Sequence, residues 1–139
     1  MFYNAAGFNQ PIDSWNMSSV TRTDYMFQDA TSFNEPIDKW NISSVKTTRG
    51  MFSGAAKFDQ PINSWDMSSV TDTSWMFRDA ASFNKPINSW KMSRVTTTSY
   101  MLSNAASFDQ PINSWDMSSN KNTGGVCVCV LCVCVCVCV

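Results

Sequence analysis

Hydrophobic residues recur along this chain at a fixed spacing of 25 residues. The clearest unit begins at Phe58 and reads Phe-Asp-Gln-Pro-Ile-Asn-Ser-Trp-Asp-Met-Ser-Ser-Val, and close versions begin at Phe8, Phe33, Phe83 and Phe108. Self-similarity at a fixed period of this length is the signature of a repeat architecture, in which each unit packs on its neighbours. The pattern predicts one domain of five copies: residues 1–25, 26–50, 51–75, 76–100 and 101–125.

Several positions of the repeat are identical in all five copies. A position that never changes is expected to pack on its own copy above and below, so the apolar ones form the predicted core. They are the columns that contain Met51, Ala55, Phe58, Ile62 and Trp65. The columns of Gln60 and Asp66 instead hold residues of both charge signs. They are expected to face solvent, because an unpaired buried charge is strongly unfavourable.

The secondary structure follows less directly from this spacing. The core residues from Met51 to Trp65 lie four and three positions apart, which is a helical stripe. Pro61 interrupts it, and a proline in a helix interior costs about 3 kcal/mol. The spacing therefore predicts one short helix for each repeat. In the centre of the chain this helix covers residues 71–81 and starts at Thr71, which could cap it. A short strand over residues 60–63 and a turn over residues 65–69 complete the copy.

The whole repeat resembles a known family. The pattern Met-Phe-x-x-Ala-x-x-Phe-Asn-Gln-Pro-Ile-x-x-Trp-Asp-Met-Ser-Ser-Val-Thr covers residues 1–125. It is similar to the BspA-like leucine-rich-repeat surface protein family, whose 25-residue repeat is of unknown function. The resemblance implies an α/β fold: a leucine-rich-repeat-like solenoid of five coils, with short parallel strands on one face and short helices or turns on the other. It also implies a cell-surface or extracellular location and a role in adhesion or protein binding.

Composition narrows the possible partners. The net charge is -1 and only 15% of residues are charged, so the basic face that nucleic acid requires is not expected. There is no run of 18 apolar residues, so no membrane span is predicted, and no signal peptide or anchor is recognisable. Histidine is absent, which removes the commonest general base and metal ligand. No cofactor and no catalytic or metal-binding residue is predicted.

The last 14 residues, 126–139, alternate valine and cysteine around Leu131 and contain all six cysteines. One interpretation is a strand with cysteines on one face that binds a soft metal. A second is an aggregation-prone strand. A third is a translated GT microsatellite, since GTG and TGT encode valine and cysteine and one extra T yields the leucine. We favour the third interpretation, a gene-model artefact.

Two polar columns and one aromatic column form the candidate partner-binding face. The polar columns hold Asp or Asn in every copy. Their side chains could alternatively bind calcium weakly, or only accept hydrogen bonds from backbone groups in turns. We favour the role in turns over calcium binding. The aromatic column has glycine in two copies, so its rings are expected to be half-exposed and available for contacts. The candidate residues are Asp13, Asp38, Asp59, Asn63, Asn84, Asn88, Asp109, Asn113, Tyr25, Trp75 and Tyr100.

The sequence is compatible with three classes of function. The first is a non-catalytic module for adhesion or protein–protein interaction, whose partner is a protein or cell-surface ligand. The second is a structural spacer with no ligand of its own. The third is an enzyme, and it has the least support. Asp66 and Asp116, the pair that glycosidase chemistry would need, lie two copies apart with Lys91 between them. A binder should gather exposed aromatic residues on one face, whereas a spacer should scatter them.

Overall fold

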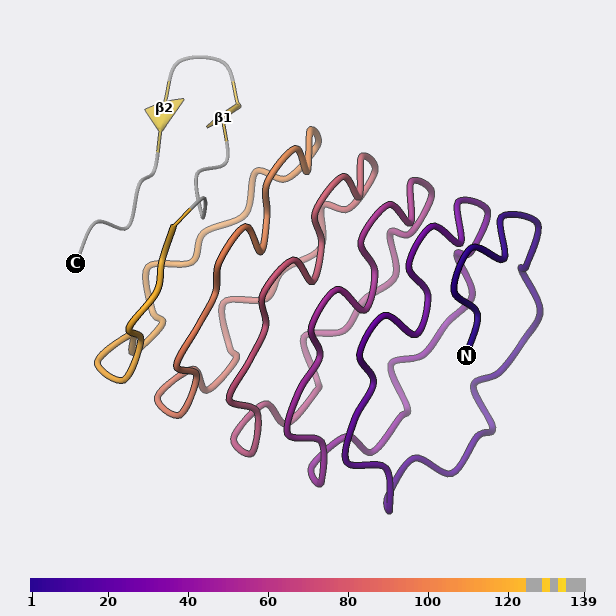
Figure 1. Ribbon diagram of the computed structural model, residues 1–139, viewed down its shortest axis with the longest axis horizontal. Helices are drawn as coiled ribbons and strands as arrows, with labels where there is room; N and C mark the ends of the chain where they lie inside the picture. Colours follow the sequence, from indigo (N-terminus) through magenta and orange to yellow (C-terminus); the bar gives the residue numbers. More distant parts are fainter. Residues whose placement is uncertain (125–128, 131–132, 135–139) are drawn as a thin grey trace.

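The computed structural model describes residues 1–124, 129–130 and 133–134. Residues 1–124 form five stacked turns of backbone (Figure 1). We call them rungs 1–5 and number them after the five copies of the sequence, so that rung 1 is residues 1–25 and rung 2 is residues 26–50. Each rung has two limbs. The first limb comprises residues 20–29 and their equivalents, the second limb comprises residues 33–42 and their equivalents, and a turn at each end joins them.

Regular secondary structure is nearly absent. In the described part of the chain there is no helix, and the two strands are β1 (Cys129–Val130) and β2 (Val133–Cys134). They pair antiparallel, with Cys129 opposite Cys134. The rungs themselves consist of turns and irregular backbone. The prediction of an α/β leucine-rich-repeat-like solenoid is therefore wrong.

The helix predicted over residues 71–81 fails because its backbone donors bond elsewhere. The N–H groups of Trp75, Phe77 and Asp79 donate to carbonyls of the following rung, at 2.9, 2.8 and 2.9 Å. Trp75 and Asp79 also have positive φ angles of 60° and 59°. A residue in the left-handed region cannot continue a right-handed helix. Hydrogen bonds between rungs thus replace the bonds that a helix would make within one rung.

The strand predicted over residues 60–63 is also absent. Pro61 has no N–H to donate, and on this limb a side chain takes part in the bonding between rungs: the N–H of Asp59 donates to Oδ1 of Asn34 at 2.8 Å. Parallel pairing occurs instead on the first limb, as single bridges that link one residue per rung. The bridged residues are Arg22, Thr47, Asp72, Thr97 and Asn122.

The turn predicted over residues 65–69 is confirmed. Oδ1 of Asp66 accepts the N–H of Ser68 at 3.0 Å, and the N–H of Val70 donates to the Met67 carbonyl at 2.9 Å. Asp66 and its equivalents are exposed, as expected. The column of Gln60 is half-buried in rungs 2–5, so the expectation that it faces solvent is wrong there. Gln60 itself donates to the carbonyl and Oδ1 of Asn34, at 2.8 and 3.0 Å.

The predicted core columns are buried in rungs 2–5, and aromatic rings stack along them. In rung 1, Met1 is exposed and Ala5, Phe8 and Trp15 are half-buried. Between rungs, Phe33 lies 5.9 Å from Phe58, measured between ring centroids. The sequence pattern missed a second phenylalanine column, because its last member is Leu102. In that column, Phe52 stacks on Phe58 of its own rung at 4.0 Å. The two phenylalanine columns come from opposite limbs, so their contact holds the limbs together.

The tryptophan column has both an apolar and a polar role. The Trp65 ring is buried, and its indole Nε1 donates to the Ile37 carbonyl of the preceding rung at 3.1 Å. The same bond recurs from Trp40, Trp90 and Trp115, at 3.0 to 3.1 Å. A buried indole N–H without a partner would be costly. This carbonyl therefore explains why tryptophan occupies the position in rungs 2–5.

Two sequence-based hypotheses concern the end of the chain. The metal-binding and artefact interpretations of residues 126–139 fall largely outside the described residues, and the structure does not bear on them. Within the described ranges, no helix has the length and apolar character needed to cross a bilayer.

Trp65→Ala should lower the free energy of unfolding by about 3–5 kcal/mol, because it removes a buried ring and leaves the Ile37 carbonyl without its indole donor. Urea denaturation measures the change. The control is Arg94→Ala, since Arg94 is exposed and makes no side-chain hydrogen bond within residues 1–124. Equal urea midpoints for the two variants would contradict the assignment of the core.

Candidate interaction surface

Three aromatic side chains lie in one column on the outside of the first limb: Tyr25, Trp75 and Tyr100. We call them the aromatic ridge. Tyr25 and Trp75 are half-buried, and Tyr100 is 49% exposed. Gly50 occupies the same column in rung 2. The ridge is therefore a line of partly exposed rings with one gap.

The backbone of the ridge is unfavourable for the residues that it carries. The φ angles of Tyr25, Trp75 and Tyr100 are 54°, 60° and 55°, close to the 59° of Gly50. This left-handed region costs a residue with a Cβ about 1–2 kcal/mol, a penalty that glycine avoids. A bulky side chain there is an outlier. Glycine would suit this column in every rung, yet three rungs have an aromatic residue.

A second left-handed column shows what the backbone alone favours. It contains Asn4, Asp29, Gly54, Asp79 and Asn104, with φ between 57° and 70°. Asn, Asp and Gly are the residues that tolerate this conformation best. Both columns belong to the same limb and make the same type of hydrogen bond to the next rung. The aromatic residues of the ridge are thus not explained by the backbone that they occupy.

Planar groups of neighbouring residues fill the gap at Gly50. A Cβ at Gly50 would lie 2.5 Å from Cδ1 of Tyr25, so the Tyr25 ring covers this glycine. Beside it, the guanidinium carbon of Arg49 lies 4.6 Å from the centroid of the Trp75 ring. Such a cation–π contact stabilises by about 0.5–1 kcal/mol at an exposed site. The ridge therefore continues through rung 2 without an aromatic residue there.

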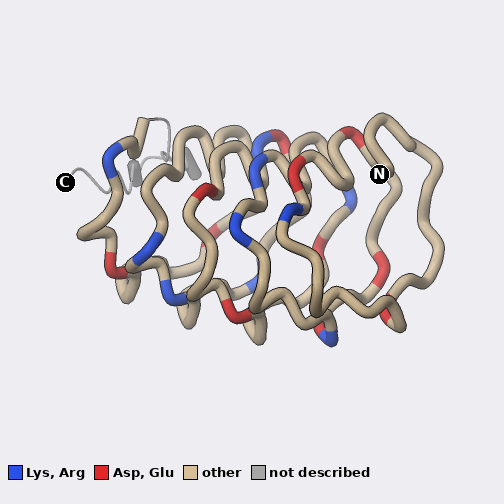
Figure 2. Tube along the Cα trace, turned by 60° about the horizontal axis from the view of Figure 1, so that its bottom comes forward, with Lys and Arg blue, Asp and Glu red and all other residues tan. Residues whose placement is uncertain are grey.

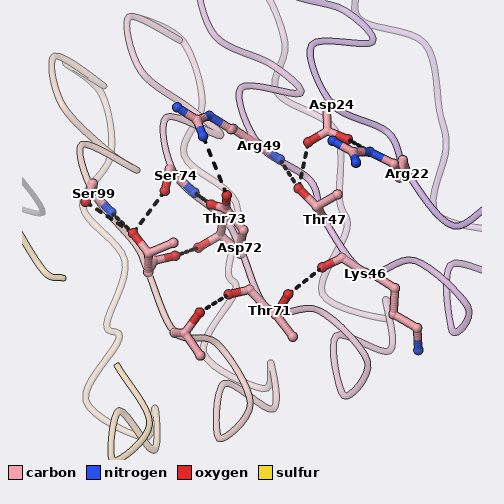
Figure 3. Close-up of polar contacts among 12 residues, drawn as sticks. Arg22, Asp24, Lys46, Thr47, Arg49, Thr71, Asp72, Thr73, Ser74 and Ser99 are labelled. Atoms are coloured by element: carbon pink, nitrogen blue, oxygen red, sulfur yellow. Dashed lines mark hydrogen bonds and ion pairs between the residues drawn. The ribbon is translucent and has the colours of Figure 1, made fainter. Parts of the chain in front are cut away.

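Polar side chains run beside the ridge and bridge successive rungs (Figure 3). We call them the polar ladder: Arg22, Asp24, Thr47, Arg49, Asp72, Ser74, Thr97 and Ser99. Asp24 accepts hydrogen bonds from Arg22 at 2.9 Å and from Thr47 at 2.7 Å, so it links rungs 1 and 2. The ladder fixes the outer edge of the limb on which the ridge stands.

The ladder continues through rungs 3 and 4 in the same way. Arg49 lies 4.0 Å from the carboxylate of Asp72, and Oδ1 of Asp72 accepts the N–H of Ser74 at 2.8 Å. The Ser74 hydroxyl then contacts that of Thr97 at 3.1 Å (Figure 3). Both acids of the ladder are therefore engaged within it. This arrangement suits a scaffold more than acid–base chemistry.

The polar candidates from the sequence lie on the second limb, away from the ridge. Asp59, Asn84 and Asp109 belong to one column. In rungs 1–4, the side chain of this column accepts the N–H of its equivalent in the next rung; Asp59 Oδ1, for example, accepts from Asn84 at 2.9 Å. Asp59 also binds Lys85 Nζ at 2.7 Å. An oxygen acceptor is required at this position, which explains why only Asn and Asp occupy it.

The other polar column contains Asp13, Asp38, Asn63, Asn88 and Asn113. Here a serine of the following rung donates to the column: Ser89 Oγ lies 2.6 Å from Asn63 Oδ1, and Ser114 repeats the contact with Asn88. Asp13 lies 3.9 Å from Lys39. Within residues 1–124, no hydrogen bond joins either polar column to the aromatic ridge. The predicted face is therefore divided between two limbs.

The pKa of Asp66 is lowered from its ordinary value, chiefly by hydrogen bonds from the hydroxyl and N–H of Ser68, with a smaller contribution from Lys91. The pKa of Asp116 is lowered by the same two bonds from Ser118. Asn16 and Asn41 fill the same turn position in rungs 1 and 2 and accept from Ser18 and Ser43. The lowered pKa values therefore result from a turn in which an asparagine side chain is also a suitable hydrogen-bond acceptor.

A shallow polar hollow of about 370 Å³ lies next to Lys91, between rungs 4 and 5. Asp116 is the one acid among its lining residues, so the hollow lacks the convergent carboxylates that glycosidase chemistry requires. No cluster of three or more His, Cys, Asp or Glu suited to a metal occurs in the described ranges. Lys and Arg residues are interspersed with Asp and Glu over the tube in Figure 2, and neither sign forms a continuous stripe.

The sequence pattern identified the ridge residues but missed Arg49. The sequence did contain an indication of its role, because Arg49 directly precedes Gly50, the one described glycine of the ridge column. A cation at the position without a ring could have been expected to contact Trp75, the ring of the next rung. The left-handed backbone left no comparable signal, since aromatic residues are not typical of it.

The family comparison comes from the repeat sequence. A sequence model described as "Mycoplasma protein of unknown function, DUF285" matches residues 1–74 and 35–128. These matches cover most of the chain. The chain belongs to this family. Comparison with curated proteins gave no match, and comparison with solved structures gave none either.

Tyr100→Gly should raise the free energy of unfolding by up to about 1 kcal/mol, because glycine relieves the left-handed strain of an exposed side chain. Tyr3→Gly is the matched control. Tyr3 is 56% exposed and does not have a positive φ, so glycine there should lower the free energy by about 0.5–1 kcal/mol through added chain entropy. Urea midpoints that shift in the same direction for both variants would argue against strain at Tyr100.

Asp66→Asn tests the acid dependence of the turn. Because the pKa of Asp66 is lowered on folding, its ionised form stabilises the protein above its ordinary pKa, and this stabilisation is lost as the pH falls through the lowered value. The small advantage of the wild type over the variant at pH 6 should shrink progressively as the pH falls below the ordinary carboxyl range, towards about pH 2. Urea midpoints at both pH values measure it. Asn41→Ala, which removes a non-titrating acceptor, should show a difference from wild type that does not depend on pH.

Proposed function

We propose that this protein is a non-catalytic interaction module that binds a protein or other ligand at a cell surface through its aromatic ridge. One observation is central: Tyr25, Trp75 and Tyr100 occupy a left-handed backbone position where glycine would be unstrained. Strained residues cluster at functional sites, where the strain is retained for a purpose other than folding. Binding is the purpose that exposed rings serve best.

The chemistry of the ridge supports this proposal. Tyrosine, tryptophan and arginine are the residues that most often dominate the energy of protein interfaces. All three types meet here, with the Arg49 guanidinium on the Trp75 ring. The hydrogen bonds of the polar ladder hold the supporting backbone, so little conformational entropy is lost when a partner binds. The resemblance to BspA-like surface proteins favours adhesion and an extracellular or cell-surface location.

A structural spacer is the second candidate. The stacked rungs make a rod-like body (Figure 1), and the polar columns of the second limb are engaged in bonds between rungs. A spacer needs those features alone. It does not account for aromatic side chains at strained positions, which is why we place binding first. The spacer role predicts that the ridge can be removed without consequence.

The triple variant Tyr25→Gly, Trp75→Gly and Tyr100→Gly tests the proposal. Labelled wild-type protein should adhere to cultured epithelial cells or to immobilised extracellular-matrix proteins. The triple variant should bind at least about tenfold more weakly, because each interface hot spot contributes 2 kcal/mol or more. A cooperative urea transition of the triple variant, with a midpoint well above the conditions of the binding assay, separates loss of binding from loss of folding.

The matched control is Tyr3→Gly, which removes an exposed ring that lies outside the ridge. This variant should bind like the wild type. Equal binding by the wild type and the triple variant would show that the ridge is not the contact surface. A wild-type protein that binds to neither probe would favour the spacer.

A further inference from the structure

The turn at the end of the second limb is built in the same way in rungs 1, 2, 3 and 5. A side-chain oxygen of an Asn or Asp accepts the N–H of the serine two residues later. The donors are Ser18, Ser43, Ser68 and Ser118, and the distances are 3.0 to 3.1 Å. In rungs 1 and 2 the serine hydroxyl donates to the same oxygen at 2.7 Å. An oxygen acceptor is therefore part of this turn in those four rungs.

Rung 4 has a lysine, Lys91, at the position of the acceptor. An ammonium group has no lone pair, so Lys91 cannot accept the N–H of Ser93. Among the residues that the structure describes, neither the N–H nor the hydroxyl of Ser93 has a hydrogen-bond partner. The backbone of the turn is nevertheless retained, since the N–H of Val95 donates to the Met92 carbonyl at 2.8 Å. Rung 4 thus keeps the turn and leaves the two donors of its serine unpaired.

The polar hollow of about 370 Å³ lies at this turn, and Lys91 and Ser93 both line it. Rung 4 supplies most of the lining and rung 5 supplies the rest, so the hollow lies along the side of the stack. Both residues are exposed, and a ligand in solution can reach them. The unpaired donors and the cation of rung 4 therefore meet in one accessible concave site.

The other polar residues of the lining already have partners within the molecule. Ser89 Oγ donates to Oδ1 of Asn63, and Ser114 Oγ donates to Oδ1 of Asn88, each at 2.6 Å. The Asp116 carboxylate accepts the N–H of the serine in its own turn. Bonds within the stack therefore account for these side chains, whereas they do not account for the side chains of the rung 4 turn.

Two carboxylates belong to the same column as Lys91, namely Asp66 in rung 3 and Asp116 in rung 5. In the described part of the chain, no ion pair within 4.0 Å joins Lys91 to either of them. Each carboxylate is engaged with the serine of its own turn. The ammonium group is therefore available, and the two negative charges disfavour an occupant that carries more than one charge of its own.

We propose that the hollow binds one carboxylate group, supplied by an acidic side chain of a partner protein. Its oxygens take the place of the missing Asn or Asp side chain: one accepts the N–H and hydroxyl of Ser93, and the other lies against the ammonium group of Lys91. Charge-assisted hydrogen bonds of this kind are roughly twice as strong as neutral ones. Asp66 and Asp116 show that a carboxylate suits this turn, because they occupy it in rungs 3 and 5.

An acidic side chain is the source that this geometry favours. The group that fills the equivalent turns is itself an Asp or Asn side chain, and a phosphate would bring a second negative charge close to Asp66 and Asp116. The hollow lies at the end of the second limb, whereas the aromatic ridge stands on the first limb. The inference therefore does not rest on the proposed role of the ridge.

Two-dimensional ¹H–¹⁵N NMR of the full-length chain, with a reductant present, reports on the Ser93 amide directly. The probes are sodium acetate and N-acetyl-aspartate amide at pH 7, where both carboxylates are ionised. Each probe replaces sodium chloride, so that ionic strength and screening stay constant. The Ser93 amide proton should move downfield and reach saturation with either probe. The amides of Ser43 and Ser68 are internal controls and should barely move, because they have acceptors within the molecule.

Lys91→Asn should abolish the saturable shift, because asparagine supplies the internal acceptor that Asn41 supplies in rung 2. Lys91→Met removes the charge without supplying an acceptor, so it should weaken binding by about tenfold, the loss of one charge-assisted bond. Lys57→Asn is the matched control, since it removes the same charge from another exposed position, and it should bind like the wild type. The spectra show whether each variant is folded, and Lys91→Met carries the test if Lys91→Asn does not fold.

Four outcomes would overturn the proposal. A Ser93 amide that does not saturate with acetate would show that Lys91 interacts only with the neighbouring aspartates. Parallel shifts of all the serine amides would indicate a general effect of the medium. A saturable shift that survives in Lys91→Asn would place the carboxylate elsewhere, and binding of acetate without binding of the blocked aspartate would exclude an acidic side chain. The triple glycine variant of the ridge should keep the Ser93 response, so the two proposals fail separately.

Discussion

The hydrogen bonds between rungs are the constraint on which the rest of this structure depends. Alternate N–H groups of the first limb donate to the next rung, as the bonds from Tyr25 to Arg49 and from Phe27 to Met51 show, at 2.8 and 2.9 Å. A backbone group that loses water must find another partner, and here the partner lies about one repeat away. These bonds use donors that a helix would need, and the left-handed residues between them keep the limb from forming a regular strand. The left-handed residues of the first limb occur in the same alternating stretch as these bonds.

Side chains complete what the backbone cannot supply. On the second limb, where Pro61 and its equivalents interrupt the backbone donors, Asn and Asp oxygens and the tryptophan indole bridge the rungs. Aromatic side chains of the same rungs stack in the core, where Phe27 and Phe33 from opposite limbs are in contact at 4.0 Å. Burial and hydrogen bonding therefore depend on a single register. Slipping a rung by one residue would lose both at once.

The proposed binding role, in contrast, depends on positions that the stack does not require. Gly50 shows that the ridge column accepts glycine, and Asn104 and its equivalents show which side chains a left-handed position ordinarily accepts. Tyr25, Trp75 and Tyr100 are exceptions to both. The same molecule thus contains the unstrained alternative, which supports binding as the proposed reason for the aromatic side chains.

The sequence by itself determined the period, the buried columns and the turn at Asp66, because identical residues 25 positions apart must meet in a stack. It also identified the ridge residues, since an aromatic column that accepts glycine cannot be fully buried. Only the tertiary structure decided the secondary structure and the division of the candidate site between two limbs. The helical spacing around Trp65 and the possible cap at Thr71 are local signals, whereas the bonds that override them join residues about 25 positions apart. Local patterns do not reveal which distant carbonyl a backbone N–H will choose.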